Sequence, residues 1–403
     1  MVESTLNDKS KTKSTAASAV RGFSVPLNPT AIEHELNSMW DQREESPEGK
    51  PGGVTHITLG NVVWFGSSRF LPRIRTIFSR MVNQYPCRIF LLEIVPGEEL
   101  TSMEAYINAY CFPATQGPSE VCCEEIHLRF PASQMHHVKG MLLPLLVADV
   151  PSYFWYFSSA PRQYESILQD LTHLADVSIN EVAFRKEPAT GLKEMAEGKN
   201  IAVSLSWFRC APLREQIASF FDDPATHPLI QQIKTLTFGW MGSSSRIQAL
   251  TNACVTTGWL ASKLGWKYQG DFTFRNGEQI VKIAFEEEDS REGVDCSEIT
   301  SFELTCEQGD EFSLKSSLCS GQTARKFCLP SVGHRSDSRF IKMHTLDEAE
   351  ALVQLLQKPL QKSNFIQAAE AGWQLLHDSL NQQEKFFTTA KIYTPETTIK
   401  HAP

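Results

Sequence analysis

The sequence predicts an α/β N-terminal domain followed by an α+β C-terminal domain with an antiparallel β-meander packed on helices. In the first half of the chain, helical and strand-like segments alternate, which favours helices layered on a sheet. Between residues 271 and 328, short β runs follow one another at turn signals, which favours antiparallel hairpins. A chain of 403 residues also exceeds the usual limit of a single core, so we expect two domains.

The expected domain organisation has two ordered parts and two tails. The opening segment is rich in Ser, Thr and Lys and poor in large apolar residues, so it cannot bury enough surface to offset ordering entropy. The expected parts are a disordered tail at 1–27, the α/β domain at 28–224, the α+β domain at 225–380 and a mobile tail at 381–403.

The first domain opens with an amphipathic helix, because Ile32, Leu36 and Trp40 share one helical stripe after a Pro29 start. Residues 44–53 read as a linker from their Pro, Gly and Glu content. Periodicity then predicts strands at 55–66, 87–95, 103–112, 121–130 and 177–184, helices at 68–84 and 163–175, and a helix that starts near Ala211.

The most hydrophobic window, residues 141–159, predicts a soluble core segment. Pro144 and Pro151 each remove an amide donor, and Asp149 places a carboxylate near the middle, so a membrane-spanning helix is disfavoured. We expect a helix over 133–146, a tight turn, and a buried aromatic strand over 152–157.

The second domain is predicted from a change of pattern. A helix-to-strand segment at 227–240 precedes a long helix at 245–266, on which the meander would pack. The expected β runs are 271–274, 279–286, 299–307 and 311–318, and the closing helices are 346–356 and 363–380.

Composition excludes several classes of protein. A formal net charge of −9 and a pI near 5.7 argue against a nucleic-acid partner, which requires a basic surface. Ten cysteines without short-range pairing do not resemble a disulfide framework, so we expect mainly reduced thiols. No apolar leader follows the first residue, and we therefore expect a cytoplasmic protein without a membrane partner.

Catalytic signatures such as GxSxG, GxGxxG and HExxH are missing. One segment, VCCEEIHLRF, could carry chemistry, because strand alternation places Cys123, Glu125 and His127 on one face. These three could bind zinc if a fourth ligand completed the site. The alternatives are a polar sheet face and a surface for a partner.

A second candidate lies in SWFRCAPLRE, where Trp207, Arg209 and Arg214 crowd the start of a predicted helix. Tryptophan and arginine are the side chains most often found at binding hot spots, so this cluster could contact an acidic partner. The alternative is a core tryptophan beside arginines whose stems cover apolar surface.

Several segments together resemble one known family. The chain is similar to the OpcA family, the glucose-6-phosphate dehydrogenase assembly proteins, over roughly residues 28–270. The resemblance is carried, in order, by IEHELNSMW, YPCRIFLLEI, CCEEIHL, LPLLVADVPSYFWYF, LSWFRCAPLRE and GWLASKLGW. The family pattern more often has a second tryptophan where this chain has Leu213.

The resemblance implies a non-enzymatic regulatory factor that needs no cofactor, binds glucose-6-phosphate dehydrogenase and promotes its active oligomeric state. It implies no catalytic residues, and it leaves Trp207, Arg209 and Arg214 as the candidate partner interface. The alternative is a metal- or thiol-dependent enzyme acting on a sugar phosphate, centred on Cys123, Glu125 and His127.

Overall fold

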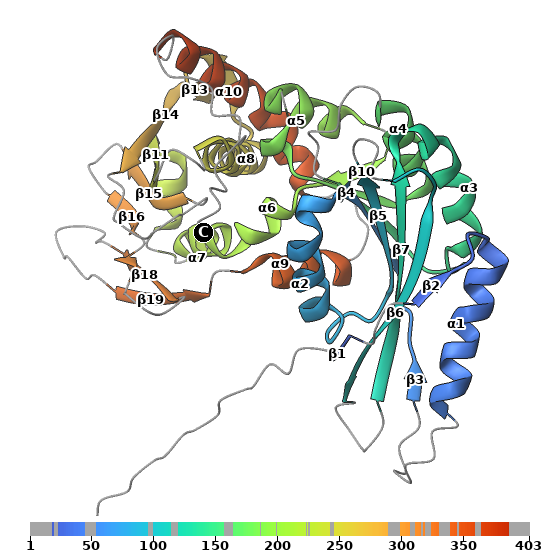
Figure 1. Ribbon diagram of the computed structural model, residues 1–403. Coiled ribbons are helices and arrows are strands. Elements are labelled where there is room, and N and C mark those ends of the chain that lie inside the picture. The colour runs from blue at the N-terminus through green and yellow to red at the C-terminus, as the bar shows by residue number, and fades with distance from the viewer. Residues whose placement is uncertain are drawn as a thin grey trace, which may run out of the picture. The chain divides into compact units, whose positions relative to one another are not determined.

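A computed structural model of the chain contains a ten-stranded, a six-stranded and a three-stranded sheet (Figure 1). The structure describes residues 18–19, 23–44, 54–95, 100–113, 120–156, 164–185, 187–198, 200–222, 224, 226–241, 246–288, 299–306, 311–315, 317–318, 324–329, 339–344, 346–358 and 364–386.

The chain forms two compact units that are not contiguous in sequence. Unit 1 consists of Met1–Glu181, Lys199–Arg209 and Leu346–Gln361, and unit 2 consists of Val182–Gly198, Cys210–Thr345 and Lys362–Pro403. A segment near the C-terminus is therefore part of unit 1. The expected domain boundary at residue 224 stays a prediction. It concerns which parts of the chain fold on their own, and the division into compact units does not test that.

Unit 1 is built on the ten-stranded sheet, whose main path runs β1-β6-β7-β5-β4-β8-β9-β10, with β2 on β6 and β3 on β7. The strands are β1 Ser18–Ala19, β2 Phe23–Val25, β3 Val54–His56, β4 Asn61–Ser67, β5 Arg88–Val95, β6 Glu104–Pro113, β7 Glu120–Pro131, β8 Ser152–Tyr156, β9 Val177–Asn180 and β10 Ile201–Val203.

The parallel strands of this sheet have doubly wound order. Each neighbouring pair from β7 through β5, β4, β8 and β9 to β10 is parallel, and β6 joins β7 antiparallel. The first strand of this series along the chain, β4, lies inside the sheet, with β5 and β7 added on one side and β8 to β10 on the other. This arrangement is that of α/β layer proteins, and it confirms the predicted α/β region.

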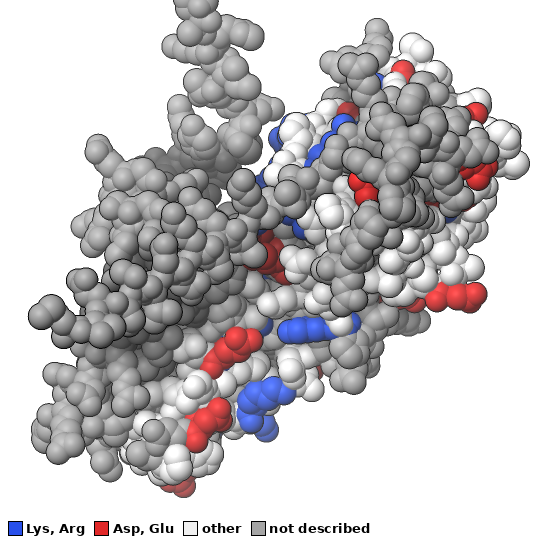
Figure 2. All heavy atoms as spheres, turned by 90° about the horizontal axis from the view of Figure 1, so that it is seen from below, with Lys and Arg blue, Asp and Glu red and all other residues white. Residues whose placement is uncertain are grey.

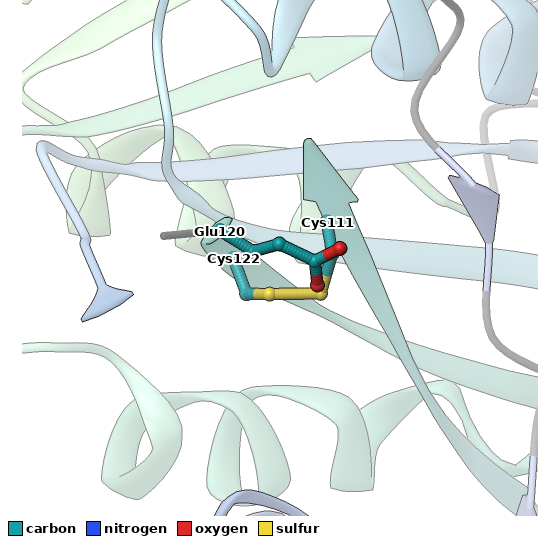
Figure 3. Close-up of side chains that lie close together, drawn as sticks. All are labelled: Cys111, Glu120 and Cys122. Carbon is teal, nitrogen blue, oxygen red and sulfur yellow. A yellow bond between two sulfur atoms is a disulfide. The ribbon is translucent and has the colours of Figure 1, made fainter. Parts of the chain in front are cut away.

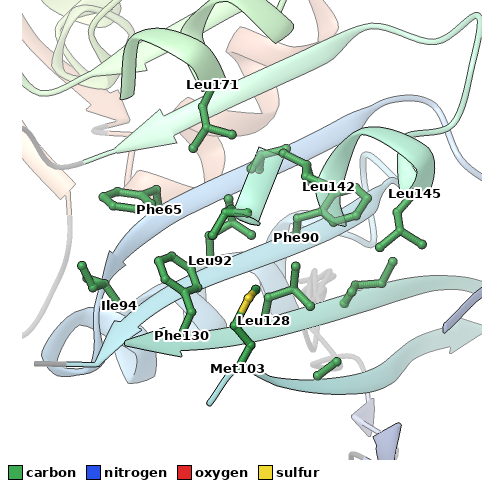
Figure 4. Packing of buried hydrophobic residues seen from close by; sticks show 14 of the residues in the cluster. Phe65, Phe90, Leu92, Ile94, Met103, Leu128, Phe130, Leu142, Leu145 and Leu171 are labelled. Carbon is green, nitrogen blue, oxygen red and sulfur yellow. The ribbon is translucent and has the colours of Figure 1, made fainter. Parts of the chain in front are cut away.

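One face of the sheet forms a continuous hydrophobic core under the helices α1, α3 and α4 (Figures 1 and 4). The helices are α1 Pro29–Glu44, α3 Val138–Leu142 and α4 Glu165–Leu174. Ile32 and Leu36 of α1 are buried in this core, as the helical stripe predicts. The strand residues in it include Phe65, Phe90, Leu92, Leu128 and Phe130.

The opposite face is covered by α2 Leu71–Met81 and by α9 Glu348–Gln357, a helix that follows much later in the chain (Figure 1). Phe78 of α2 packs edge-on against Trp155 of β8, with ring centroids 6.1 Å apart. Asp347 caps α9 in a capping box with Glu350 and also pairs with Arg80 of α2. The ion pair thus joins the start of α9 to α2, and Leu352 and Leu356 of α9 are buried.

Unit 2 contains the six-stranded sheet of order β12-β13-β14-β11-β15-β16. Strand β11 lies between β14 and β15 and is parallel to β14, so the expected simple meander is not confirmed. The pairs β12–β13, β13–β14 and β15–β16 are antiparallel, and β12 was not predicted from the sequence. These strands are β11 Ile233–Met241, β12 Lys267–Gly270, β13 Thr273–Asn276, β14 Gln279–Glu288, β15 Ile299–Cys306 and β16 Glu311–Lys315.

A three-stranded sheet, four α-helices and two 3-10 helices complete the described part of unit 2. Helices α8 and α10 cross so closely that a Cβ at Gly258 would lie 2.0 Å from the Ala368 carbonyl oxygen. The elements are β17 Ser317–Leu318, β18 Ala324–Leu329, β19 Arg339–His344, α5 Pro188–Glu197, α7 Ala211–Asp222, α8 Arg246–Leu264 and α10 Asn364–Phe386.

In the hydrophobic window at 141–159, Leu142, Leu145 and residues 152–156 are buried, Leu143 is 52% exposed, and the last three positions lie outside the described residues. Helix α3 and a 3-10 turn at Leu143–Leu145 lead to β8, whose five residues are all buried. Asp149 adopts a positive φ of 61° in the connecting turn. Among the described helices, none has the length and hydropathy needed to cross a membrane.

Two local expectations were wrong or incomplete. The single strand predicted over 55–66 is divided into β3 and β4, because the chain passes tightly at Gly60. There, a Cβ would lie 2.9 Å from the Tyr85 hydroxyl oxygen and 3.0 Å from the Pro151 carbonyl oxygen. Helix α5, the short helix α6 Leu205–Arg209, and the strands β1, β2, β10, β12 and β19 were not predicted. Each has ten residues or fewer, too few for a clear periodic signal.

Candidate functional site

A row of polar side chains lies on the α2 face of the sheet in unit 1. Strand alternation puts Glu125 and His127 of β7 on this face, as predicted, and Arg75 of α2 contacts both. Glu125 is fully buried and accepts hydrogen bonds from Tyr110 at 2.5 Å, Asn108 at 2.7 Å and Arg75 at 3.1 Å. Three donors therefore compensate the burial of this carboxylate.

The contacts of His127 define its tautomer. Its Nδ1 lies 3.2 Å from Nη2 of Arg75, and its Nε2 lies 2.7 Å from Oε2 of Glu93. A guanidinium only donates, so Nδ1 accepts and Nε2 carries the hydrogen that is donated to Glu93. Both imidazole nitrogens are thereby engaged by protein groups.

Glu93, at the carboxyl end of β5, is the most strongly perturbed carboxylate of this row. Burial acts to raise the pKa of Glu93, but hydrogen bonds from His127 and Ser68 and the nearby charge of Arg129 outweigh it. Together they lower the pKa of Glu93 to about 2. Arg129 also donates to Glu104 at 2.7 Å, so it bridges two carboxylates. The row is a chain of internal ion pairs.

The zinc set considered from the sequence is not assembled. The donor atoms of Cys123, Glu125 and His127 are not among the described groups close enough to share an ion. Burial raises the pKa of the Cys123 thiol to about 12, so Cys123 is not a reactive thiolate.

A different group of side chains that can bind metal ions lies where β6 ends and β7 begins. Cys111, Glu120 and Cys122 place their ligand atoms within 4.8 Å of one another (Figure 3). Cys111 and Cys122 form a disulfide. The expectation of no short-range pairing was therefore wrong for these two. The described cysteines outside this disulfide are all buried: Cys87, Cys123, Cys210, Cys254 and Cys306.

A second ionic cluster lies on the opposite face of the sheet and attaches α1. Arg88 of β5 donates to Glu124 at 2.7 Å, to Glu33 of α1 at 2.6 Å and to the Leu145 carbonyl at 2.6 Å. Burial acts to raise the pKa of Glu124, but His56 and Arg88 outweigh it, so the pKa is lowered. Three separate segments therefore meet at one guanidinium.

The end of α1 is tied to the same carboxylate. Trp40 donates from Nε1 to Glu124 at 3.4 Å and stacks on His56, with ring centroids 4.9 Å apart. Nε2 of His56 lies 3.3 Å from Glu124. Glu33 and Trp40, Arg88, Glu124 and Leu145 come from four of the segments that resemble the OpcA family, so these segments contact one another in the folded chain.

The three residues of the predicted interface fall in two helices. Trp207 and Arg209 belong to α6 in unit 1, whereas Arg214 belongs to α7 in unit 2. Trp207 and Arg214 are only 9% and 8% exposed, and Arg209 is more accessible. Burial lowers the pKa of Arg214 to about 10. The interface itself stays a prediction, and Arg209 is its most accessible member.

Arg209 also interacts with a buried carboxyl group of unit 1, that of Glu181. Glu181 is buried and accepts hydrogen bonds from Ser206 at 2.7 Å and Ser204 at 3.3 Å. Burial raises the pKa of Glu181, and the hydrogen bond from Ser206 and the positive charge of Arg209 oppose that rise. Arg209 therefore stabilises a buried carboxylate, a role that the sequence did not reveal.

Figure 2 shows the charged side chains on one face of the molecule. Lys and Arg side chains are interspersed with Asp and Glu side chains, so no patch of a single charge sign covers the described part of this face. Mixed charge of this kind limits long-range attraction to a highly charged partner.

The doubly wound sheet places unit 1 among the α/β proteins, and the chain as a whole consists of two compact units. Family models then match most of the chain. The N-terminal domain of the glucose-6-phosphate dehydrogenase subunit matches residues 79–197, and the C-terminal domain of the same family matches residues 202–369. The chain belongs to this family, the OpcA glucose-6-phosphate dehydrogenase assembly family.

Curated relatives agree with the family assignment. A protein of Nostoc punctiforme named "Putative OxPP cycle protein OpcA" is 27% identical over 66% of this chain and 55% of its own length. A protein of Synechocystis sp. with the same name is 29% identical over 45% of this chain and 38% of its own length. The chain thus matches about half the length, or less, of these relatives.

Among solved structures, an oxidoreductase from Bacillus cereus aligns with 80% of this chain over 97% of its own. It is 10% identical, with a TM-score of 0.36. A score this low does not establish a shared fold or activity.

Proposed function

We propose that this protein is a non-enzymatic regulatory factor that binds glucose-6-phosphate dehydrogenase in the cytoplasm and promotes its active oligomeric state. One observation carries the proposal: the two family models that match the chain both describe domains of a glucose-6-phosphate dehydrogenase subunit. Their matches at 79–197 and 202–369 lie in order along one chain, so the resemblance extends over both halves.

The chemistry of the buried charges favours a binding role over catalysis. Glu93, Glu125 and His127 are engaged by other protein groups, and the Cys123 thiol is held neutral by burial. A general base or nucleophile has to be available to a substrate. The sugar-phosphate enzyme centred on Cys123, Glu125 and His127 is therefore the less favoured function.

A binding partner shifts an enzyme between oligomeric states only through a difference in affinity for those states. A tenfold shift requires about 1.4 kcal/mol of differential binding free energy. Such a difference is small compared with the free energy of a protein interface. The proposed activation thus requires preferential binding to the active oligomer and no chemistry by this chain.

The proposal is tested by sedimentation velocity of glucose-6-phosphate dehydrogenase with and without this protein. We expect the two proteins to co-sediment and the dehydrogenase to shift towards a larger species. An unrelated acidic protein of similar mass serves as the control. Separate sedimentation of the two proteins at micromolar concentrations would contradict the proposal.

A further inference from the structure

The group where β6 ends and β7 begins combines side chains that metal ions prefer as ligands. Cys111 and Cys122 are direct cross-strand partners, with Cα atoms 4.2 Å apart. Glu120 precedes Cys122 by two residues, so the two side chains lie on the same face of β7. Figure 3 shows the Glu120 carboxylate beside the two sulfur atoms.

From this geometry we infer that the reduced form of the protein binds a thiophilic divalent cation, Zn²⁺, through Cys111, Cys122 and Glu120. The ligand atoms already lie within 4.8 Å of one another. Zinc bonds to thiolate at about 2.3 Å and to carboxylate at about 2.0–2.2 Å, so small side-chain rotations bring all three to one ion. Two thiolates select zinc over magnesium or calcium, and water takes the fourth tetrahedral position.

The strands hold the ligands in place before the ion arrives. β6 and β7 pair over ten consecutive positions, from Glu104–Arg129 to Pro113–Glu120. Two ligands therefore sit on neighbouring backbone segments whose separation is fixed by the sheet. Glu120 is exposed, whereas Cys122 is fully buried, so an ion approaches the group from the side of the Glu120 carboxylate.

The disulfide and the metal site exclude each other, because each sulfur forms either the S–S bond or the bond to the ion. A dithiol reductant breaks the Cys111–Cys122 bond, supplies two electrons and two protons, and becomes a disulfide itself. Zn²⁺ then displaces the two thiol protons and binds both thiolates. The cation also offsets the repulsion between two thiolates and the Glu120 carboxylate.

The adjacent cysteine provides a matched control. Cys123 follows Cys122 directly, but its side chain lies on the opposite face of β7, is buried, and has its pKa raised to about 12 by that burial. A Cys123→Ser variant therefore removes a thiol one position away without touching the proposed ligand set.

The test uses the full chain, reduced with a phosphine and titrated with Co²⁺, whose thiolate complexes give a ligand-to-metal charge-transfer band in the near ultraviolet. We expect one Co²⁺ per chain, displaced by Zn²⁺, in the parent and in Cys123→Ser. Cys111→Ser and Cys122→Ser should lose the band, and Glu120→Gln should weaken binding by roughly tenfold. Absence of the band in the reduced parent, or its survival in both serine variants, would overturn the site.

A second measurement needs no variant. In the reduced parent, Zn²⁺ should slow alkylation of Cys111 and Cys122, followed by mass spectrometry of their peptides, and should slow re-formation of the disulfide. Equal alkylation rates for Cys111 with and without Zn²⁺ would overturn the inference even if a serine variant failed to fold. Neither result depends on binding to the dehydrogenase.

Discussion

The hydroxyl of Tyr153, in β8, donates a hydrogen bond of 3.2 Å to the carbonyl oxygen of Leu356, which lies 203 residues further along the chain. Leu356 belongs to α9, and α9 also pairs with α2 through Arg73 and Glu348. The α2 face of the sheet in unit 1 is therefore completed by residues that follow most of unit 2 in sequence. Folding of unit 1 should depend on this late segment.

A cavity-creating substitution in α9 tests whether the stability of unit 1 depends on this helix. Leu352 is fully buried, so Leu352→Ala should lower the free energy of unfolding by about 2–5 kcal/mol. Gln354→Ala, on the half-buried side of the same helix, should change it by less than about 0.5 kcal/mol. Urea denaturation of both variants measures the difference. Equal midpoints would show that α9 contributes little to unit 1.

The pH dependence of the free energy of unfolding should reflect the ionisation of Glu93. The folded pKa of about 2 lies below the ordinary value of 4.5, so ionised Glu93 stabilises the fold above pH 4.5, and this contribution is lost as the pH falls towards 2. Glu93→Gln should cost on the order of 1–3 kcal/mol at pH 7 and flatten the acid limb. The exposed Glu197→Gln is the control. Parallel acid limbs for parent and Glu93→Gln would contradict the assignment.

The close crossing of α8 and α10 should tolerate no side chain at Gly258. A Cβ there lies 2.0 Å from the Ala368 carbonyl oxygen, so Gly258→Ala should destabilise unit 2 by about 1–3 kcal/mol. Gly140→Ala is the matched control, because nothing lies within 4 Å of its added Cβ, and it should be neutral or stabilising by up to about 1 kcal/mol. Thermal melting distinguishes them. Similar midpoints would show that the helices separate easily.

The predicted interface at Arg209 can be separated from its structural role. Arg209→Ala should weaken activation of the dehydrogenase by roughly tenfold or more if the side chain contacts the partner. Glu181→Gln replaces the buried carboxyl group beside Arg209 but keeps the arginine, so it should retain activation. Activity titrations and melting curves of both variants provide the comparison. An equal loss in both would place the effect in the interior.

Much of the fold could be predicted from hydrophobic periodicity. The helix carrying Ile32 and Leu36, the strands β5 to β8 and the start of α7 at Ala211 follow from local patterns of apolar residues and prolines. The position of β11 between β14 and β15 could not be predicted, because strand order depends on long-range pairing that no local pattern encodes. The return of α9 to unit 1 was missed for the same reason.

The candidate sites were less predictable than the fold. Alternation correctly put Glu125 and His127 on one face, but the partners Arg75 and Glu93 come from other elements, so the ion pairs were invisible in the sequence. The pairing of Cys111 with Cys122 depends on the register of β6 and β7, which the sequence does not specify. The register is set by packing of both strand faces.

The central claim is tested most directly by the activity of glucose-6-phosphate dehydrogenase titrated with this protein at a fixed, low enzyme concentration. We expect a saturable rise in activity that parallels the fraction of dehydrogenase in the larger oligomer and disappears when this protein is heat-denatured. Unchanged activity and unchanged oligomer size at saturating concentrations of the folded protein would contradict the account.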